Sequence, residues 1–294
     1  MIVNDLVYGE IEFGDAIAKI IDSQPIQRLK QIHQGGAVFL AYPNISTSRF
    51  EHSVGVCHLI RILGGDLQEQ IAGLLHDISH TAFSHVVDYV LENQEEDFHE
   101  YYKLRFLMDE ELAKVLYSLE LQPEDFVADR RFSLLERELP KLCADRIDYT
   151  LRDLIAWGKI SQQEAQEFLN SLEVVGGTIA VNSVSQGCWF KNNYEYLNWH
   201  FFRDAKNMLA NSAFSKLLKE ALRIEVLQPE DFFQDDNFIL DKIDSREMLR
   251  ESLELIKIQL EEPKEAINNP KFKVREVDPL IVKNGSAIPL SALL

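Results

Sequence analysis

Two histidines and two aspartates in this sequence have the residue types and local settings expected of a divalent-metal site. His52 lies in the run RFEHS, His76 and Asp77 are adjacent in LLHDISH, and Asp145 begins the run DRIDY. Imidazole and carboxylate ligands suit borderline or hard cations such as Mn, Fe, Ni, Zn or Mg. Four protein ligands leave positions open on an octahedral ion for water and substrate. The expected chemistry is therefore attack of metal-activated water on a phosphate ester.

Three helices are expected to place these four side chains, over residues 48–63, 66–78 and 140–157. Ser48 and Asp66 are suitable N-terminal caps for the first two, and Pro140 suits the first turn of the third. Adjacent residues on a helix project about 100° apart, so His76 and Asp77 can both reach one ion. Each of these residues, taken alone, is more often a structural or solvent-exposed residue. Their occurrence together is what predicts a metal site.

The rest of the chain predicts a mainly α fold with small β-hairpin appendages. A break at Pro25 is expected within the first of the further helices, which are predicted over 15–34, 81–93, 98–120, 161–172, 194–225 and 245–261. One hairpin is expected over 178–190 around Gly187 and another around Asn284-Gly285, with 272–277 extended. Residues 1–225 are expected to form the core. Residues 226–294 are expected to form a helical segment and a hairpin that pack on this core and do not fold independently.

The composition limits the class of partner. The chain has 294 residues, a formal net charge of −18 and a pI near 4.9. Such acidity argues against a face that neutralises many nucleic-acid phosphates, so a phosphate must be held by a metal and a few local cations. No apolar run of about 18 residues predicts a membrane span. Three dispersed cysteines (Cys57, Cys143 and Cys188) and the lack of a basic, apolar leader favour a cytoplasmic protein.

Around these residues the chain resembles the HD-domain metal-dependent phosphohydrolases. Within them it is similar to the deoxynucleoside triphosphate triphosphohydrolases and their small bacterial relatives. The resemblance covers about residues 20–155 and is carried by residues 25–29, 49–56, 76–85 and 145–149, while 277–291 looks like the tail of small bacterial members. It implies an HD-domain helical bundle, and a metal held by His52, His76, Asp77 and Asp145.

The resemblance also implies roles for residues around the metal. The side chains implied in proton transfer and in orienting the reacting groups are His80, Asp88 and His99. Those implied in phosphate binding are Arg49, His85 and Arg146. Tyr149 would lie against the sugar, and Asp153 with Gln34 would bind its 3′-hydroxyl. Histidines suit proton transfer because they titrate near neutral pH, and guanidinium groups can grip phosphate oxygens in pairs.

Two departures from the family pattern leave the substrate open. Gly35 stands where the family has a bulky apolar residue that crowds the sugar 2′ position. The stretch 202–212 keeps Arg203 but has no tyrosine matching the one that relatives place there.

The expected activity is hydrolysis of a small-molecule nucleotide, with a deoxynucleoside triphosphate cleaved to deoxynucleoside and triphosphate as one form. Phosphomonoesterase and cyclic-nucleotide phosphodiesterase activities stay open. So does a nucleotide-sensing protein that keeps the metal site but turns over poorly. Homo-oligomerisation is also left open.

Overall fold

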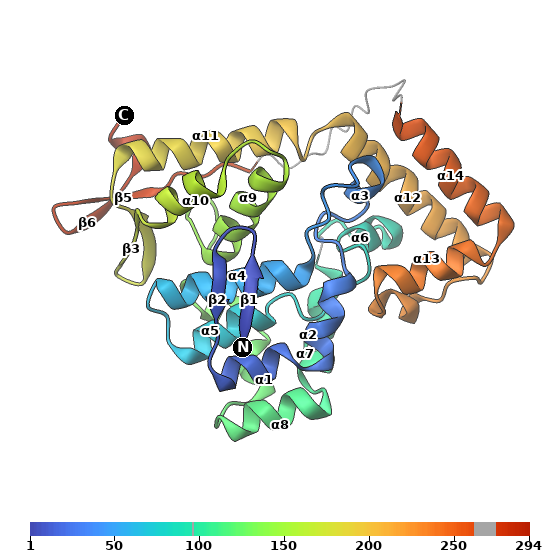
Figure 1. The fold of residues 1–294 in the computed structure, drawn as a ribbon, viewed down its shortest axis with the longest axis horizontal. Helices are drawn as coiled ribbons and strands as arrows, with labels where there is room; N and C mark the ends of the chain where they lie inside the picture. Colours follow the sequence, from blue (N-terminus) through green and yellow to red (C-terminus); the bar gives the residue numbers. More distant parts are fainter. Residues whose placement is uncertain (96, 262–274) are drawn as a thin grey trace.

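A computed structural model describes residues 1–95, 97–261 and 275–294 and confirms a mainly helical fold with small sheets (Figure 1). The helices are α1 (Asp15–Ile21), α2 (Gln24–Arg28), α3 (Val38–Ala41), α4 (Arg49–Ile62), α5 (Leu67–Leu75), α6 (Val86–Leu91), α7 (Lys103–Leu107), α8 (Glu110–Ser118), α9 (Ala144–Ala156), α10 (Gln162–Leu169), α11 (Val184–His200), α12 (Ala205–Arg223), α13 (Asp236–Asp244) and α14 (Glu247–Glu261). The strands are β1 (Ile2–Asp5), β2 (Gly9–Glu12), β3 (Leu172–Val175), β4 (Thr178–Val181), β5 (Leu280–Lys283) and β6 (Ser286–Pro289).

Helix α4 lies at the centre of the fold and packs against both α5 and α9. Its start follows from local sequence, because Ser48 and Glu51 form a capping box. The Ser48 hydroxyl accepts from the Glu51 backbone N–H at 3.2 Å, and the Glu51 carboxylate accepts from the Ser48 N–H at 2.8 Å. Almost every residue of α4 between Arg49 and Ile60 is buried. The helix is therefore a rigid central support for any side chain it carries.

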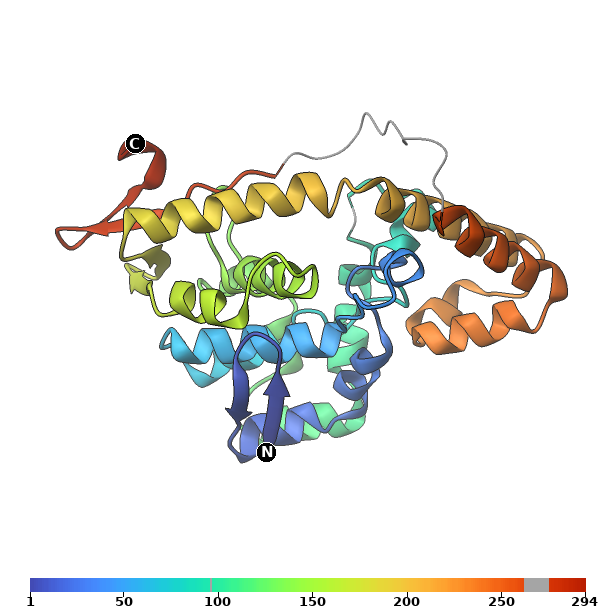
Figure 2. The same cartoon turned by 45° about the horizontal axis from the view of Figure 1, so that its top comes forward.

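The described apolar core falls into two clusters. The larger one surrounds α4, α5 and α9 and includes residues of α1, α10 and α11, with Ile281 and Leu290 from the C-terminal part. The smaller joins α6 and α12 to α13 and α14. In Figure 2, α12, α13 and α14 gather at one end of the molecule, whereas α10, α11 and the C-terminal strands lie at the other. Of the helices in the described ranges, none is both long and apolar enough to cross a bilayer.

The hairpin expected over 178–190 is wrong. Strand β4 pairs antiparallel with the preceding β3, and Gly176 and Gly177 both adopt positive φ at the turn between them. Residues 188–190 instead lie within α11, where Phe190, Tyr194 and Leu197 are buried at helical spacing. A short apolar run cannot by itself distinguish a strand from a buried helix, and here the packing of α11 decides.

Several expected helices also differ. The one over 98–120 is divided between α7 and α8, because Asp109 caps α8, and the one over 140–157 begins only at Ala144, so Pro140 lies before its first turn. The one over 194–225 is divided into α11 and α12, and Asp204 caps α12 by accepting from the N–H groups of Lys206 and Asn207. The one over 81–93 begins only at Val86, because Phe83 and Ser84 have φ of 57° and 52°. Non-glycine residues rarely adopt this left-handed conformation, which cannot continue a right-handed helix.

The hairpin around Asn284-Gly285 forms as predicted, between β5 and β6. Strand β5 also pairs in parallel with β4, so the four strands make one sheet in the order β3-β4-β5-β6. This long-range pairing has no local sequence signal. The extended run expected over 272–277 lies in part outside the described residues.

Candidate metal centre

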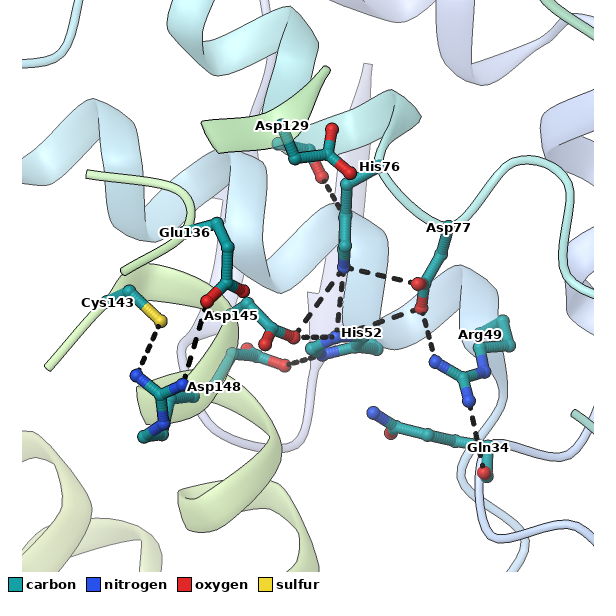
Figure 3. A network of polar contacts seen from close by, with 12 residues as sticks. Gln34, Arg49, His52, His76, Asp77, Asp129, Glu136, Cys143, Asp145 and Asp148 are labelled. Carbon is teal, nitrogen blue, oxygen red and sulfur yellow. Dashed lines mark hydrogen bonds and ion pairs between the residues drawn. The ribbon is translucent and has the colours of Figure 1, made fainter. Parts of the chain in front are cut away.

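Three separate elements bring the four candidate metal ligands together (Figure 3). His52 projects from α4, His76 and Asp77 directly follow α5, and Asp145 lies in the first turn of α9. His52 Nε2 lies 3.2 Å from His76 Nε2, 3.0 Å from Asp145 Oδ1 and 3.8 Å from Asp77 Oδ2. His76 Nε2 lies 3.4 Å from Asp77 Oδ1. Because α5 ends at Leu75, a turn rather than a helix directs the His76-Asp77 pair, contrary to the sequence expectation.

The two imidazoles are oriented by acceptors behind them. His52 Nδ1 lies 2.7 Å from Asp148 Oδ1, and His76 Nδ1 lies 2.8 Å from the Gly73 carbonyl oxygen. A carbonyl can only accept, as can an ionised carboxylate, so both Nδ1 atoms carry the hydrogen. In the neutral rings both Nε2 lone pairs then face each other and the carboxylates. Such a set of donor atoms fits a divalent cation.

The charges around the centre favour a cation there. Burial alone would lower the pKa of His52, but hydrogen bonds to Asp145 and Asp148 outweigh it and raise this pKa to about 9. Burial would raise the pKa of Asp77, yet the Arg49 guanidinium beside it holds this pKa well below the usual range. The cluster thus combines ionised carboxylates with an imidazole that attracts a proton. A divalent ion would satisfy the same acceptors.

Asp148 and Arg152, which sequence reasoning did not select, complete the support behind His52. Asp148 accepts from Arg152 Nε at 3.0 Å and from Nη2 at 2.9 Å, and both side chains are fully buried. The available signal was their spacing, since Asp148 lies one helical turn after Asp145 and Arg152 one turn further. Such a pair is usually a solvated salt bridge, and only its burial marks it as part of the site.

Arg49 lies beside the cluster of candidate ligands. Its Nη1 donates to Asp77 Oδ2 at 2.7 Å, and its Nε donates to the Ser84 hydroxyl at 2.9 Å. The side chain is buried, and Ser84 in turn donates to the His33 carbonyl oxygen at 2.7 Å. The guanidinium is thus fixed next to the candidate ligands.

Next to Asp77, the cluster of candidate ligands is flanked by three histidines and an aspartate (His80, His85, His99 and Asp88). His80 Nε2 is 3.3 Å from Asp77 Oδ1, and its ring stacks on that of His99 with centroids 3.7 Å apart. His85 Nδ1 is 3.1 Å from Asp88 Oδ2, and Asp88 also accepts from the Phe98 N–H at 3.2 Å. His80 lies beyond the end of α5, so it reaches the centre from a loop and not from the helix face expected.

The stacked imidazoles of His80 and His99 are neutral near pH 7. Burial, with the nearby Arg49 charge, holds the pKa of His80 well below its usual range. Burial and the neighbouring His85 lower the pKa of His99 to about 3. A neutral imidazole can both donate and accept a hydrogen bond, so this group is able to relay a proton.

The guanidinium of Arg146, which was expected to bind phosphate, contacts the loop before α9. Its Nη1 donates to the Lys141 carbonyl oxygen at 2.7 Å and to that of Arg137 at 3.1 Å, while Nη2 lies 3.6 Å from Glu136. The guanidinium thus holds the loop before α9. Consecutive helix residues point about 100° apart, which is why the neighbour of Asp145 need not face the metal.

The residues expected at the sugar lie on α9 and on the loop before α3. The Tyr149 hydroxyl is 3.1 Å from that of Tyr194, and Asp153 is buried, which raises its pKa to about 7. The Gln34 side-chain oxygen is buried without a hydrogen-bond partner among the described residues. Arg203, from the stretch that departs from the family pattern, lies over the Trp199 ring at 4.0 Å.

The span from α4 to α9 holds all four candidate ligands, and residues 49–153 match the model of the HD domain family. The chain belongs to the HD-domain family.

Relatives of this HD-domain chain include proteins named for an activity. It is 43% identical over 242 residues to the protein YdhJ of Bacillus subtilis, covering 82% of the chain and 74% of YdhJ. It is 37% identical over 174 residues to the metal-dependent phosphohydrolase cns2 of Cordyceps militaris, covering 58% of the chain and 50% of cns2. It is 26% identical over 311 residues to the deoxynucleoside triphosphate triphosphohydrolase SAMHD1 homolog of Dictyostelium discoideum, covering 94% of the chain and 54% of the homolog. The chain thus spans about half the length of cns2 and of the Dictyostelium homolog.

Proposed function

We propose that this HD-domain protein is a divalent-metal-dependent phosphohydrolase that acts on a nucleotide. The observation that carries the proposal is the convergence of His52, His76, Asp77 and Asp145, with both Nδ1 atoms engaged behind the imidazoles and both Nε2 atoms facing inward. A cation bound there would supply an activated water and would neutralise charge on the phosphate. The names of the relatives agree with this class of reaction.

The chain's own residues suggest how the phosphate would be held. Arg49 is buried next to Asp77, and His85 is held by Asp88, so both can meet a phosphate without first being ordered. Arg146 differs in location, because its guanidinium contacts two loop carbonyls and Glu136, whereas that of Arg49 contacts the candidate ligand Asp77. We therefore assign the phosphate contacts to Arg49 and His85. The neutral pair His80 and His99 would hold and pass the proton that the leaving group needs.

Two buried polar groups support a sugar as part of the substrate. The buried Gln34 side-chain oxygen has no partner among the described residues, and Asp153 has a carboxyl group whose pKa burial raises to about 7. An unsatisfied buried polar group is costly, and a sugar hydroxyl could donate to Gln34 or pair with the Asp153 carboxyl group. Tyr149 would lie against the ring. A deoxynucleoside triphosphate cleaved to deoxynucleoside and triphosphate is the substrate most consistent with the Dictyostelium relative's name.

The decisive experiment measures nucleotide hydrolysis by the metal-loaded protein, with Asp77→Ala as the test variant and Asp241→Ala, on the exposed surface of α13, as the control. We expect Asp77→Ala to abolish both metal binding and turnover, and Asp241→Ala to change neither. Equal hydrolysis by Asp77→Ala and the parent protein would show that the metal mechanism is wrong.

The product distinguishes the forms of the activity. Tripolyphosphate release from a deoxynucleoside triphosphate supports the triphosphohydrolase. Orthophosphate from a monophosphate supports the phosphomonoesterase, and opening of a cyclic nucleotide supports the phosphodiesterase. Metal and nucleotide binding without turnover would indicate a sensing protein.

A further inference from the structure

A continuous chain of buried polar contacts connects the candidate metal centre to the N-terminal hairpin. It runs from His52 Nδ1 to Asp148 at 2.7 Å, and from Asp148 to Arg152 through two hydrogen bonds. Arg152 Nη1 then donates to Asp5 Oδ2 at 2.9 Å. The exposed fraction is 0% for Arg152 and Asp148 and 8% for Asp5. Solvent screening is therefore weak along the whole chain of contacts.

The hairpin fixes the Asp5 carboxylate. Its Oδ1 accepts from the backbone N–H of Val7 at 2.7 Å and of Tyr8 at 3.0 Å, within the turn that joins β1 to β2. The other oxygen is thereby directed at Arg152. Asp5 lies far from the four metal ligands in sequence, so no local pattern around them includes it.

Gly55 independently shows that α4 is shaped around this pair of charges. A Cβ at this position would lie 2.1 Å from Asp148 Oδ2 and 2.3 Å from Arg152 Nη2, so no side chain fits. Gly55 has helical backbone geometry, so the glycine is needed for the close approach and not for a turn. It lies one turn after His52 on the same helix. The metal ligand and the space for its support are thus provided by one element.

We propose that Asp5 is a positioning residue for the metal centre, acting through Arg152 and Asp148 on His52; this rests on the proposed metal function. The physical reason is charge sharing. With Asp5 present, the guanidinium charge is divided between two carboxylates, and Asp148 keeps enough negative charge to polarise the Nδ1–H of His52. A polarised Nδ1–H makes Nε2 a stronger metal ligand. Without the Asp5 charge, Arg152 interacts with Asp148 alone and neutralises more of its negative charge. His52 is then polarised less and binds metal more weakly.

The test is the affinity of the full chain for Mn²⁺ alone, measured by calorimetric titration of metal-free protein. The test variant is Asp5→Asn, which keeps the shape of the side chain and removes its charge. The control is Ile11→Ala, which weakens packing of the same hairpin at a buried position but leaves the polar contacts. We expect Asp5→Asn to weaken Mn²⁺ binding about tenfold, at the lower end of the range for outer-shell partners. The Ile11→Ala variant should bind within about twofold of the parent, even where its metal-free form melts earlier.

A second arm keeps the test decisive if Asp5→Asn does not fold. Arg152→Lys can contact one carboxylate but cannot bridge both, and it should lose affinity to a similar degree. In an Asp148→Asn background, Asp5→Asn should have no further effect, because the path is already broken. Unchanged Mn²⁺ affinity in folded Asp5→Asn or Arg152→Lys would overturn the proposal. Failure of the parent protein to bind Mn²⁺ any better than Asp77→Ala would instead overturn the metal function itself.

Discussion

Charged side chains around the candidate metal centre are buried in opposed pairs. Arg49 faces Asp77 with exposed fractions of 7% on both side chains, and Arg152 faces Asp148 with 0% on both. Breaking such a pair leaves an uncompensated buried charge, which costs far more than the pair contributes. At the scale of residues, truncating one partner of these pairs is therefore expected to lower stability as well as function.

Asp153 gives a pH-dependent prediction. Burial raises its pKa from 3.8 to about 7, so between these values the folded protein holds a proton that the unfolded chain has released. The free energy of unfolding should therefore fall as pH rises through this window, by up to about 1.4 kcal/mol per pH unit from this residue. Asp153→Asn removes that dependence.

Urea denaturation of the metal-free protein at pH 5 and pH 8 measures this effect. The stability of Asp153→Asn relative to the parent should be greater at pH 8 than at pH 5. A difference that does not change with pH would show that the Asp153 carboxyl titrates normally.

Gly35 gives a prediction about the sugar. Its φ lies outside the left-handed region, and the nearest atom to an added Cβ would be Val38 Cγ2, at 3.2 Å, so the backbone conformation does not require glycine. We expect the parent protein to hydrolyse ribonucleotides and deoxyribonucleotides with similar kcat/KM. Gly35→Leu should shift this ratio at least about tenfold toward deoxyribonucleotides, because a misfit of a kcal/mol or two is worth that factor. An unchanged ratio would show that residue 35 does not face the 2′ position.

At the scale of elements, the segment that carries His80 and His85 is held from two sides. Arg28 on α2 donates to the carbonyls of Ile78 and His80, and also to those of Phe233 and Gln234. Asp236, the first residue of α13, accepts from the Phe83 N–H at 2.6 Å. The Asp236 contact anchors Phe83, which like Ser84 has a left-handed conformation that costs energy in an isolated chain.

Removing the Arg28 hydrogen bonds should affect turnover more than metal binding. Arg28→Met leaves four carbonyls without their donor, which should lower the free energy of unfolding by about 3 kcal/mol. We expect kcat to fall by about tenfold or more as His80 loses its position, while Mn²⁺ affinity stays within about twofold. Arg130→Met, at an exposed arginine, is the control and should leave the free energy of unfolding, kcat and Mn²⁺ affinity unchanged. A parallel loss of metal affinity would show that the Arg28 hydrogen bonds support Asp77 as well.

The sequence predicted those elements whose ends have local signals. Ser48 as an N-terminal cap located the start of α4, and Asn284-Gly285 located the last hairpin. It also selected four candidate ligands that the structure brings together, because these residue types occur jointly, each in a specific local setting. It failed where packing decides. The 188–190 run was placed in a strand, and Asp5 could not be joined to His52 because their contact passes through two intermediaries distant in sequence.

At the scale of the whole molecule, a metal ion would connect α4, the turn after α5, and α9, which are far apart along the chain. A ligand that binds only the folded state stabilises it, by about 2.7 kcal/mol at a hundred times its Kd. For a chain of this size we expect Mn²⁺ to raise Tm by roughly 5 °C over the EDTA-treated protein. Asp77→Ala should abolish this rise. An equal rise in that variant would mean that the ion binds elsewhere.

The parallel pairing of β4 with β5 has a consequence for the order in which the chain folds. Ile281 and Leu290 pack against the helix face left open by Gly187 on α11, and β5 covers an edge of β4. A ribosome makes β4 and α11 long before it makes these residues. Until they emerge, the nascent protein carries an open strand edge and an uncovered apolar helix face, the two surfaces on which partly made chains associate. The β5–β6 hairpin is thus the last part of the larger core to pack into place.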